Sequence, residues 1–338
     1  MKKVWFAAFT IMSAFVIACL SGELLVRILA PQPYLFPRPQ YSEEYGHVLH
    51  KNTRIVNGIP GGYRFTYTVN EYGYRGIPVK PAPDSSRHRI VVLGDSYGFG
   101  IGVPDGEDFA SVLKNKLGDR VDAINLSVGG YGLAQEIRRY YEFGHCYQPA
   151  VVILQFCAND PVDNLQNKVT EVRSDSFAFR KTENSVAWLK QYLSRSPLQM
   201  SQLYNFLRDR LYDVFAGRDV IDARIRIGRE LHTEEGGAIA PEEAFYVSLL
   251  ETFARALNRN GVRFLMIAVN GQLARFPFIN KRVEELNAKG DMEYIDVVPW
   301  FEGVNDYGSP EGHSWGSKAH FIIGTHLATI IRPSLRTP

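Results

Sequence analysis

The sequence predicts an α/β fold, with a parallel sheet covered by helices on both faces and an apolar helix at the N-terminus. Two observations lead to this prediction. Short apolar runs alternate with stretches of helical periodicity after residue 88, and residues 4–20 are uncharged and apolar. Strands that alternate with helices along a chain pair in parallel and bury both faces of their sheet. The 338 residues suffice for one large α/β domain with attachments or for two small domains.

The apolar run at residues 4–20 follows Lys2 and Lys3. As a helix with a rise of about 1.5 Å per residue it spans roughly 26 Å, slightly less than the ~30 Å hydrocarbon core of a bilayer. The two lysines favour a cytoplasmic N-terminus. We therefore expect residues 1–30 to be a signal anchor or signal peptide with a single transmembrane helix. The rest of the chain would lie on the periplasmic or extracellular side of the cell membrane.

Three alternatives to an uncleaved anchor stay open. Residues 16–18 before Cys19 resemble a lipoprotein processing site, which would make Cys19 a lipidated residue. A cleaved signal peptide would lead to secretion of the chain. A buried core helix would leave the chain without any export signal.

Residues 31–88 are rich in Pro, Gly, Tyr and Asn and are expected to form a lead-in with short strands. Alternation in Tyr63–Val69 predicts a strand or hairpin, and the remainder is expected to be irregular. The pattern of apolar runs and helices then sets in, and it predicts the α/β domain over residues 89–332.

Five apolar runs predict the strands of this domain: Ile90–Leu93, Val121–Leu126, Val151–Phe156, Val262–Val269 and Tyr294–Val297. Amphipathic stretches predict its helices: Asp108–Leu117, Gly132–Phe143, Pro241–Asn260 and a closing helix from about Gly316 to Ile331.

Residues 161–238 interrupt this alternation and carry no strand-like run. We expect a mostly helical insertion that packs on the domain. A lid over the site and an amphipathic arm on the membrane are the alternatives. Cys146 and Cys157 would lie at opposite ends of a buried strand over Pro149–Phe156, beyond the ~7 Å Cα separation that a disulfide allows. Both are therefore expected to be free, buried thiols.

Charge and motif content exclude several classes of partner. The formal net charge is +2 and the basic residues form no stripe beside aromatic residues, so no nucleic-acid partner is expected. The glycines at 98–102 lack the full pattern of a phosphate-binding loop. No pairing of histidines or cysteines has the spacing of a zinc site. We expect neither a cofactor nor a metal.

Ser96 is the first candidate for chemistry. It follows the predicted strand Ile90–Leu93 and precedes glycines at 98, 100 and 102. In open α/β sheets, ligands bind at the carboxyl ends of the strands. The simpler interpretation of a serine here is a helix N-cap in an ordinary loop. The ends of two further strands favour a catalytic role instead.

Those strand ends offer hydrogen-bond donors. Gly130 lies in a glycine-rich turn after Val121–Leu126, and Asn159 follows Val151–Phe156. Ester hydrolysis builds negative charge on the carbonyl oxygen, and one preorganised donor to that charge is worth about 3 kcal/mol. The Ser96 N–H, the Gly130 N–H and the Asn159 amide would form an oxyanion hole.

A serine nucleophile also needs a base, and His313 is the candidate. It lies in a loop before the closing helix, two residues after Glu311. A neutral imidazole can take the serine proton and return it to the leaving alcohol, while a carboxylate holds its tautomer. His320 and His326 lie inside the predicted closing helix and are expected to serve packing.

Four motifs follow one another along the chain: GDSYGFG at 94–100, NLSVGGYG at 125–132, CAND at 157–160 and an acid-x-His block at 311–313. Their order resembles the SGNH (GDSL-like) hydrolase superfamily, in particular its membrane-anchored or exported bacterial members. The segment VNEYGYRG at 69–76 is similar to one that precedes the first block in those members. The resemblance spans about residues 69–331 apart from the insertion.

The resemblance implies a flavodoxin-like three-layer α/β/α sandwich with about five parallel strands. It also implies Ser96 as nucleophile, Gly130 and Asn159 in the oxyanion hole, His313 as base, and no cofactor. Two positions depart from the family pattern: Cys157 stands in place of the usual Gly, and Glu311 in place of an Asp before the histidine. Asp306 is the alternative acid.

The function that these expectations favour is a serine esterase that hydrolyses an O-acyl ester outside the cytoplasm, with acetyl on a cell-envelope saccharide as the favoured substrate. Its partners would be a small-molecule or glycan ester and, through the N-terminal helix, the membrane. A polysaccharide O-acetyltransferase with the same residues and a lipid esterase are alternatives. An inactive SGNH-fold protein that binds glycan or serves an envelope assembly is the alternative of another class.

Overall fold

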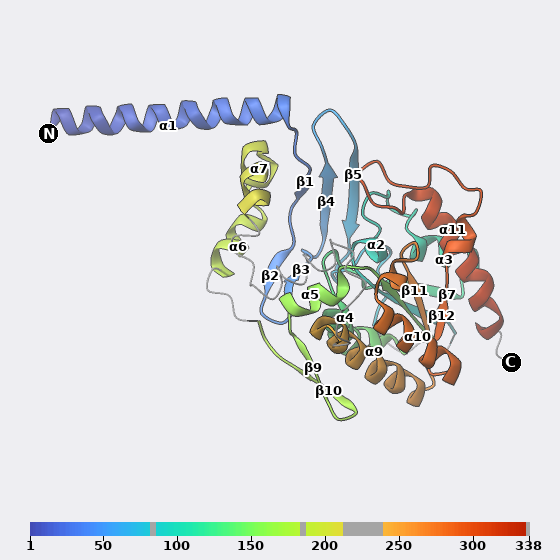
Figure 1. The fold of residues 1–338 in the computed structure, drawn as a ribbon. Coiled ribbons are helices and arrows are strands. Elements are labelled where there is room, and N and C mark those ends of the chain that lie inside the picture. Colours follow the sequence, from blue (N-terminus) through green and yellow to red (C-terminus); the bar gives the residue numbers. More distant parts are fainter. Residues whose placement is uncertain (82–85, 183–186, 212–238, 336–338) are drawn as a thin grey trace.

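Five parallel strands form the central sheet of the computed structural model (Figure 1), which describes residues 1–81, 86–182, 187–211 and 239–335. Their order across the sheet is β12-β11-β8-β6-β7. In chain order the strands are β6 (His88–Leu93), β7 (Val121–Asn125), β8 (Val151–Phe156), β11 (Arg263–Ala268) and β12 (Glu293–Ile295). All five predicted strands are confirmed, with ends that differ from the prediction by at most two residues.

The strand order decides where a site can form. Counted in chain order, it is that of a flavodoxin-like sheet, in which the first strand lies between the second and the third. Here β6 lies between β7 and β8. The connections leave β6 toward one edge and β8 toward the other, so loops diverge at the carboxyl ends of these two strands. The predicted three-layer fold class is confirmed, and its usual ligand position lies beside the residues that follow β6 and β8.

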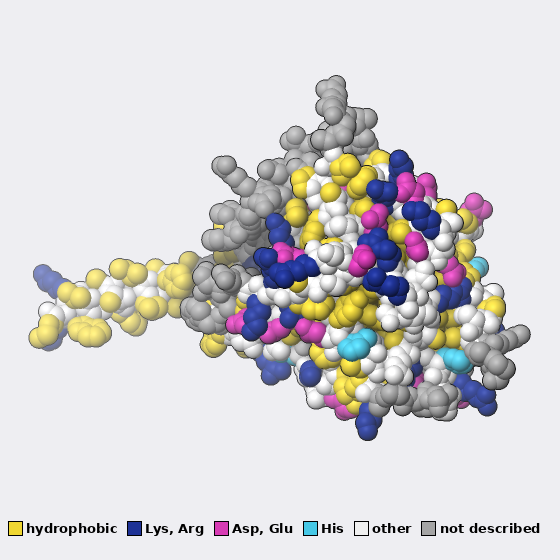
Figure 2. Space-filling view, turned by 90° about the horizontal axis from the view of Figure 1, so that it is seen from below, with side chains coloured by type: hydrophobic (Ala, Val, Ile, Leu, Met, Phe, Trp, Pro, Cys, Tyr) yellow, Lys and Arg dark blue, Asp and Glu magenta, His cyan; other side chains and the backbone are white. Residues whose placement is uncertain are grey.

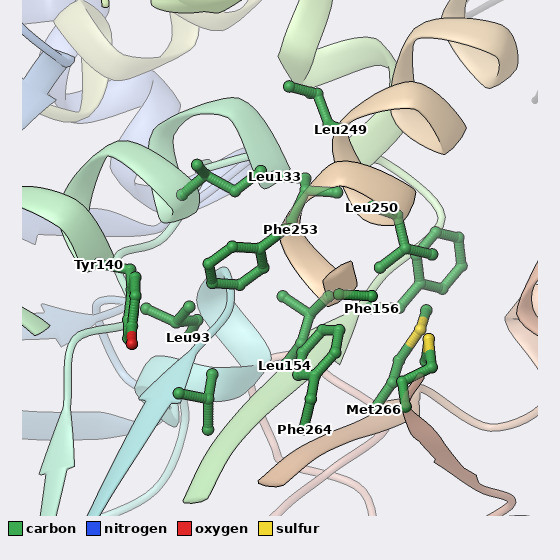
Figure 3. Close-up of a cluster of buried hydrophobic side chains, with 14 of the residues drawn as sticks. Leu93, Leu133, Tyr140, Leu154, Phe156, Leu249, Leu250, Phe253, Phe264 and Met266 are labelled. Atoms are coloured by element: carbon green, nitrogen blue, oxygen red, sulfur yellow. The ribbon is translucent and has the colours of Figure 1, made fainter. Parts of the chain in front are cut away.

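One face of the sheet packs against α4 (Leu133–Glu142), α9 (Pro241–Arg259) and α10 (Pro277–Lys289). Alternate residues of each strand point to this face, including Leu93 and Leu154. Figure 3 shows these side chains close to Leu133 and Phe253 of the helices. This cluster is the larger of the two that enclose the sheet.

The opposite face packs against α3 (Phe109–Leu117) and α11 (Ser317–Ile331). Ile90 and Val92 of β6 point to this side, one residue out of step with their neighbours on the other face. The predicted helices of the domain are thus confirmed, and the closing helix α11 lies in contact with α3. The remaining helical segments of the domain are short: α2 (Ser96–Phe99), α5 (Asp160–Gln166), η1 (Gly144–Tyr147), η4 (Gln272–Arg275), η5 (Val298–Phe301) and η6 (Arg332–Leu335).

The lead-in is more regular than its composition predicts. It contains a three-stranded antiparallel sheet, β1-β4-β5, and a separate β2–β3 hairpin. The strands are β1 (Tyr34–Phe36), β2 (Gln40–Ser42), β3 (Gly46–Val48), β4 (Thr53–Gly58) and β5 (Arg64–Val69). Buried residues of this part, Tyr67 among them, share one hydrophobic cluster with Phe99, Val128 and Tyr131 of the α/β domain. The lead-in therefore packs directly beside the loops that follow β6 and β7.

The predicted insertion differs from expectation where it begins. β9 (Thr170–Arg173) and β10 (Ser176–Phe179) form an antiparallel hairpin, so the expectation of no strand in this region is wrong. Phe177 of the hairpin packs against the large cluster beside Tyr141 and Phe253. This contact stabilises strands that are only four residues long. Helical elements follow as predicted: α6 (Ala187–Ser194), η2 (Pro197–Met200) and α7 (Gln202–Leu211). Residues 183–186 and 212–238 of the insertion lie outside the described residues.

The N-terminal helix α1 (Lys2–Leu29) projects from the body of the molecule (Figures 1 and 2). Figure 2 shows hydrophobic side chains along its visible side and basic side chains at its free end. Its most apolar window has a mean hydropathy of 2.1, and none of that window is buried. It is a helix long and apolar enough to cross a bilayer, as the sequence predicts.

The cysteines follow the prediction only in part. All three described cysteines are free, and Cys157 is buried. Cys146 is exposed, so the prediction that it is a buried thiol is wrong. The reason is that β8 begins only at Val151, and Cys146 lies before it in the surface turn η1.

His320 is a packing residue, as predicted. Its ring is fully buried, stacks on Phe109 with 5.8 Å between centroids, and accepts a hydrogen bond from the Phe109 N–H at 3.0 Å through Nδ1. Burial lowers the pKa of His320 to about 3, and the positive charge of Arg75 acts in the same direction. The ring is therefore neutral in the folded protein at physiological pH.

This buried neutral ring predicts a pH-dependent stability. Between pH 3 and 6.5 the unfolded chain binds a proton at this histidine that the folded chain does not. Its contribution is thus fully present above pH 6.5 and is lost as the pH falls toward 3. His320→Asn keeps an acceptor near the Phe109 N–H but does not titrate. It is expected to flatten the slope of unfolding free energy against pH, by up to about 1.4 kcal/mol per pH unit. Urea unfolding at pH 5 to 8 measures this slope, and identical slopes for both proteins would contradict the account.

Candidate active site

Ser96 lies at the carboxyl end of β6, at the start of α2. Gly94 permits the close turn: a Cβ there would lie 2.6 Å from Gln155 Oε1 of β8. The Gln155 side chain in turn accepts hydrogen bonds from the N–H groups of Asp95 and Gly98 at 3.2 and 2.7 Å. The neighbouring strand thereby fixes the backbone on both sides of Ser96.

A chain of two short contacts starts at the Ser96 hydroxyl. Ser96 Oγ lies 2.9 Å from His313 Nε2, and His313 Nδ1 lies 2.6 Å from Glu311 Oε1. A carboxylate only accepts hydrogen bonds, so His313 Nδ1 carries the proton and donates a hydrogen bond to Glu311. His313 Nε2 is then unprotonated and can accept a hydrogen bond from the Ser96 hydroxyl. The Glu311 side chain is 7% exposed and that of His313 is 22% exposed. This is the arrangement in which an imidazole can withdraw a serine proton.

A tight loop holds Glu311 and His313 together. The Ser309 N–H donates to the His313 carbonyl at 2.8 Å, and the His313 N–H donates to Glu311 Oε1 at 3.1 Å. Gly102 lies against this loop, where a Cβ would stand 2.5 Å from Glu311 Oε1. Asp306, the alternative acid, is exposed and has left-handed backbone, with φ of 53°. Of the two predicted acids, the structure brings Glu311 to the histidine.

The ring of His313 is also held by aromatic neighbours. It meets the edge of Tyr97 at 4.6 Å between centroids, and Tyr97 packs in the same way on Trp315 at 5.5 Å. The Trp315 Nε1–H donates to Asn270 Oδ1 at 2.8 Å. This stack limits rotation of the imidazole about its contact with Glu311.

Gly130 lies in a β-turn directly beside Ser96. The Tyr131 N–H donates to the Val128 carbonyl at 3.1 Å, which closes the turn over Gly129 and Gly130. A Cβ on Gly129 would be 3.7 Å from Ser96 Cβ. Central N–H groups of such a turn take no part in its own hydrogen bond. Ser96 is the first residue of α2. The first N–H groups of a helix have no acceptor within the helix, so the Ser96 N–H takes no part in the hydrogen bonds of α2.

Asn159, the third predicted donor, is already engaged. It precedes α5, and its Nδ2 donates to Asp163 Oδ2 at 2.6 Å. Its side chain also hydrogen-bonds Asp95, the residue before the serine. An amide has two protons to donate, so service to an oxyanion requires one of these bonds to be shared or released.

Asp95 is a site residue that sequence reasoning missed. Its carboxylate is buried and caps α2 by accepting from the Tyr97 N–H at 2.9 Å. Burial raises the pKa of Asp95, while hydrogen bonds from Tyr97 and Asn159 and the nearby His313 oppose the rise. Cys157, which replaces the expected glycine, is buried too, and burial raises the pKa of its thiol well above the usual value. It is a neutral packing group beside the site.

Arg75 is the second residue that was missed, within the segment 69–76. Its guanidinium is almost completely buried and lies 4.7 Å above the Tyr67 ring. It donates to the carbonyls of the loop after Ser96 and pairs with one carboxylate at 3.1 Å; these partners are Phe99, Gly100, Val103 and Asp105. Only the resemblance of segment 69–76 hinted at a role, because the partners lie 24 to 30 residues away.

His47 of β3 is a third residue that was not singled out. Its Nε2 lies 2.9 Å from the Gly129 carbonyl oxygen. Contacts join residues 94–100 to residues 125–132, 157–160 and 311–313, and His47 adds a contact from the lead-in. Within the described residues, no group of three or more His, Cys, Asp or Glu side chains could hold a metal ion.

No family model matches the chain, and no curated protein matches it. Several solved structures are similar to it. One, named TesA, has a TM-score of 0.43 and 13% identity and covers 73% of this chain and 100% of its own. A putative lipolytic protein of the G-D-S-L family from Desulfitobacterium hafniense scores 0.40, with 11% identity and coverage of 72% and 99%. The carbohydrate acetylesterase Est24 from Sinorhizobium meliloti scores 0.38, with 8% identity and coverage of 74% and 100%.

The buried guanidinium predicts a large loss of stability when it is removed. Arg75→Met leaves the loop carbonyls and Asp105 without their donor, and we expect a loss of about 3 kcal/mol in unfolding free energy. Arg64→Met is the matched control, because Arg64 is an exposed arginine on β5 of the lead-in, and a change within about 0.5 kcal/mol is expected. Urea unfolding at pH 7 measures both. Equal, small losses in the two variants would show that the buried contacts contribute little.

Proposed function

We propose that this chain is a serine esterase of the SGNH type that hydrolyses an O-acyl ester outside the cytoplasm. One observation carries the proposal: Ser96 Oγ, His313 and Glu311 form a continuous chain of contacts of 2.9 and 2.6 Å. A serine, a base and an orienting acid in this order are the requirement for nucleophilic acyl transfer. The motif order that resembles SGNH hydrolases supports the same conclusion.

The proposed reaction begins with attack of Ser96 Oγ on the ester carbonyl carbon while His313 Nε2 takes the hydroxyl proton. The resulting imidazolium is stabilised by Glu311, and the oxyanion accepts hydrogen bonds from the N–H groups of Ser96 and Gly130. Collapse of the intermediate breaks the ester bond, and His313 returns its proton to the leaving alcohol. Water, activated by the same histidine, then releases the acid and restores the serine.

The favoured substrate class is an acetyl ester of a cell-envelope saccharide. A polysaccharide O-acetyltransferase would use the same residues, with a sugar hydroxyl in place of water in the second step. A lipid esterase requires an acyl channel near Ser96 from α6 and α7, yet these helices lie on the far side of the β1–β4–β5 sheet from α2 (Figure 1). An inactive SGNH-fold protein has no need of an acid at His313, so the contact of Glu311 with His313 supports an active enzyme over this alternative.

The acid assignment gives the sharpest test of the proposed reaction. Using p-nitrophenyl acetate with the full chain in detergent, we expect Ser96→Ala to lower kcat at least about 10³-fold. Glu311→Gln should lower it about 10³- to 10⁴-fold, because the amide cannot stabilise the imidazolium. Asp306→Asn is the matched control and should stay within about 3-fold of the wild type. Turnover that survives Ser96→Ala would refute the proposal, and loss of activity only in Asp306→Asn would reassign the acid.

We also propose that α1 remains attached and anchors the domain in the cell membrane. A contact between α1 and the insertion supports this. Glu23 accepts hydrogen bonds from Ser201 Oγ at 2.8 Å and from the N–H groups of Gln202 and Leu203 at 3.1 and 2.9 Å. The two N–H groups lie in the first turn of α7 and have no acceptor within that helix. Glu23, near the end of α1, therefore caps α7. Gly22 lies against Leu203 beside this cap.

The anchor proposal predicts how the protein fractionates. The 28-residue helix should hold the chain in the membrane fraction after carbonate extraction, and protease added outside the cytoplasmic membrane should degrade the domain. Cys19→Ala should fractionate like the wild type, because the helix alone is enough. A wild-type chain shortened to begin at Cys19, beside a full-length Cys19→Ala, would instead support a lipoprotein. Release of the wild type into the soluble fraction would support secretion.

A further inference from the structure

We propose that His47 is a positioning residue that selects the orientation of the Gly129–Gly130 peptide and so aims the Gly130 N–H at the oxyanion. The inference rests on the proposed function. It assigns a catalytic purpose to the β2–β3 hairpin of the lead-in, which lies 82 residues before the turn that it contacts.

The first step is the type of the turn. The bond from the Tyr131 N–H to the Val128 carbonyl makes Val128–Tyr131 a four-residue β-turn. Gly130, at its third position, has φ of +78°, and Gly129 is not among the glycines with positive φ. These values identify a type II turn. Types I and II differ mainly by rotation of the central peptide, which here joins Gly129 to Gly130.

The second step is what decides between the two orientations. Two glycines at the centre of a turn accept either sign of φ at little steric cost, so the turn itself does not fix the central peptide. The hydrogen bond at 2.9 Å between His47 Nε2 and the Gly129 oxygen fixes the orientation of the central peptide. A carbonyl oxygen only accepts, so Nε2 is the donor. Reversal of the peptide would break this bond and leave the half-buried Gly129 carbonyl without this donor.

The third step follows from peptide geometry. In a planar trans peptide the C=O and the N–H point in opposite directions. Fixing the Gly129 oxygen toward His47 therefore fixes the Gly130 N–H away from His47. Gly129 itself lies against Ser96, with a notional Cβ 3.7 Å from Ser96 Cβ. The geometry thus turns one peptide into a fixed donor next to the nucleophile.

His47 is held firmly enough to act this way. Tyr131, the last residue of the turn, donates its hydroxyl to the His47 carbonyl at 2.8 Å, and its ring packs on the imidazole with 5.1 Å between centroids. The hairpin is also tied to α4, the helix that follows the turn. Gln135 Nε2 donates to the Tyr45 carbonyl at 2.6 Å and Arg138 Nη1 to the Glu44 carbonyl at 2.7 Å.

The test compares two replacements of His47 in the full chain, with p-nitrophenyl acetate as the probe. His47→Phe keeps an aromatic ring beside Tyr131 but has no donor. His47→Gln places an amide Nε2 donor near the position of the histidine Nε2. We expect His47→Phe to lower kcat roughly 10- to 100-fold with KM within about 3-fold, because one oxyanion donor is misdirected rather than removed. His47→Gln should restore kcat to within about 3-fold of the wild type.

His326→Phe is the control for replacing a histidine by phenylalanine, because His326 is exposed on α11 and stacks on Trp300 away from this turn. It should leave kcat unchanged. Wild-type kcat in His47→Phe, alongside turnover that depends on Ser96, would overturn the inference and leave the proposed function standing. Equal loss in His47→Phe and His47→Gln would also overturn it, because ring packing would then explain the effect.

Crystal structures of the variants decide the matter without reference to activity. We expect the Gly129–Gly130 peptide of His47→Phe to be reversed or to occupy two orientations, and that of His47→Gln to keep φ of Gly130 near +78°. If the wild type shows no turnover that depends on Ser96, the proposed function fails on its own. A single, unchanged peptide orientation in His47→Phe would overturn the inference in either case.

Discussion

The buried guanidinium of Arg75 is the interaction on which the organisation of the site depends. It takes the carbonyl oxygens of Phe99, Gly100 and Val103 as partners and so fixes the path of the chain after α2. That path brings Gly102 against Glu311, close enough that only a glycine fits there. Glu311 in turn orients His313 toward Ser96. A residue of the lead-in is thereby linked, through one loop, to both ends of the chain of contacts that joins Ser96, His313 and Glu311.

The lead-in thus contributes to the site at two separate points. Arg75 supports the loop after Ser96, and His47 contacts the turn that holds Gly130, the second backbone donor that we propose. The hydrophobic cluster around Tyr67 and Tyr131 joins these points, because it contains residues from the lead-in and from both loops. Preorganised donors stabilise a developing charge only if they do not have to reorient during the reaction. The packed lead-in adds rigidity to the glycine-rich loops that follow β6 and β7.

Local patterns predicted the sheet, the helices of both layers and the convergence of Ser96 and His313, since periodicity and turn residues act over a few positions. The contact of Glu311 rather than Asp306 with His313 needed the folded loop, because both acids lie within seven residues of the base. Arg75 and His47 escaped prediction because their partners are distant in the chain. The β9–β10 hairpin was not predicted because its strands are short and similar in composition to the segments around them. The exposure of Cys146 was not predicted because the surface turn that holds it is similar in composition to the strand that follows.

The central claim is that Ser96 is a nucleophile activated by His313, and covalent labelling tests it most directly. The full chain would be treated with a fluorophosphonate and digested, and the adduct would be located by mass spectrometry. The account predicts one adduct, on Ser96, that forms at least about 100-fold more slowly in His313→Ala, because the neutral serine hydroxyl is a weak nucleophile without its base. An adduct on another residue, no adduct at all, or labelling of Ser96 that is equally fast without His313 would contradict it.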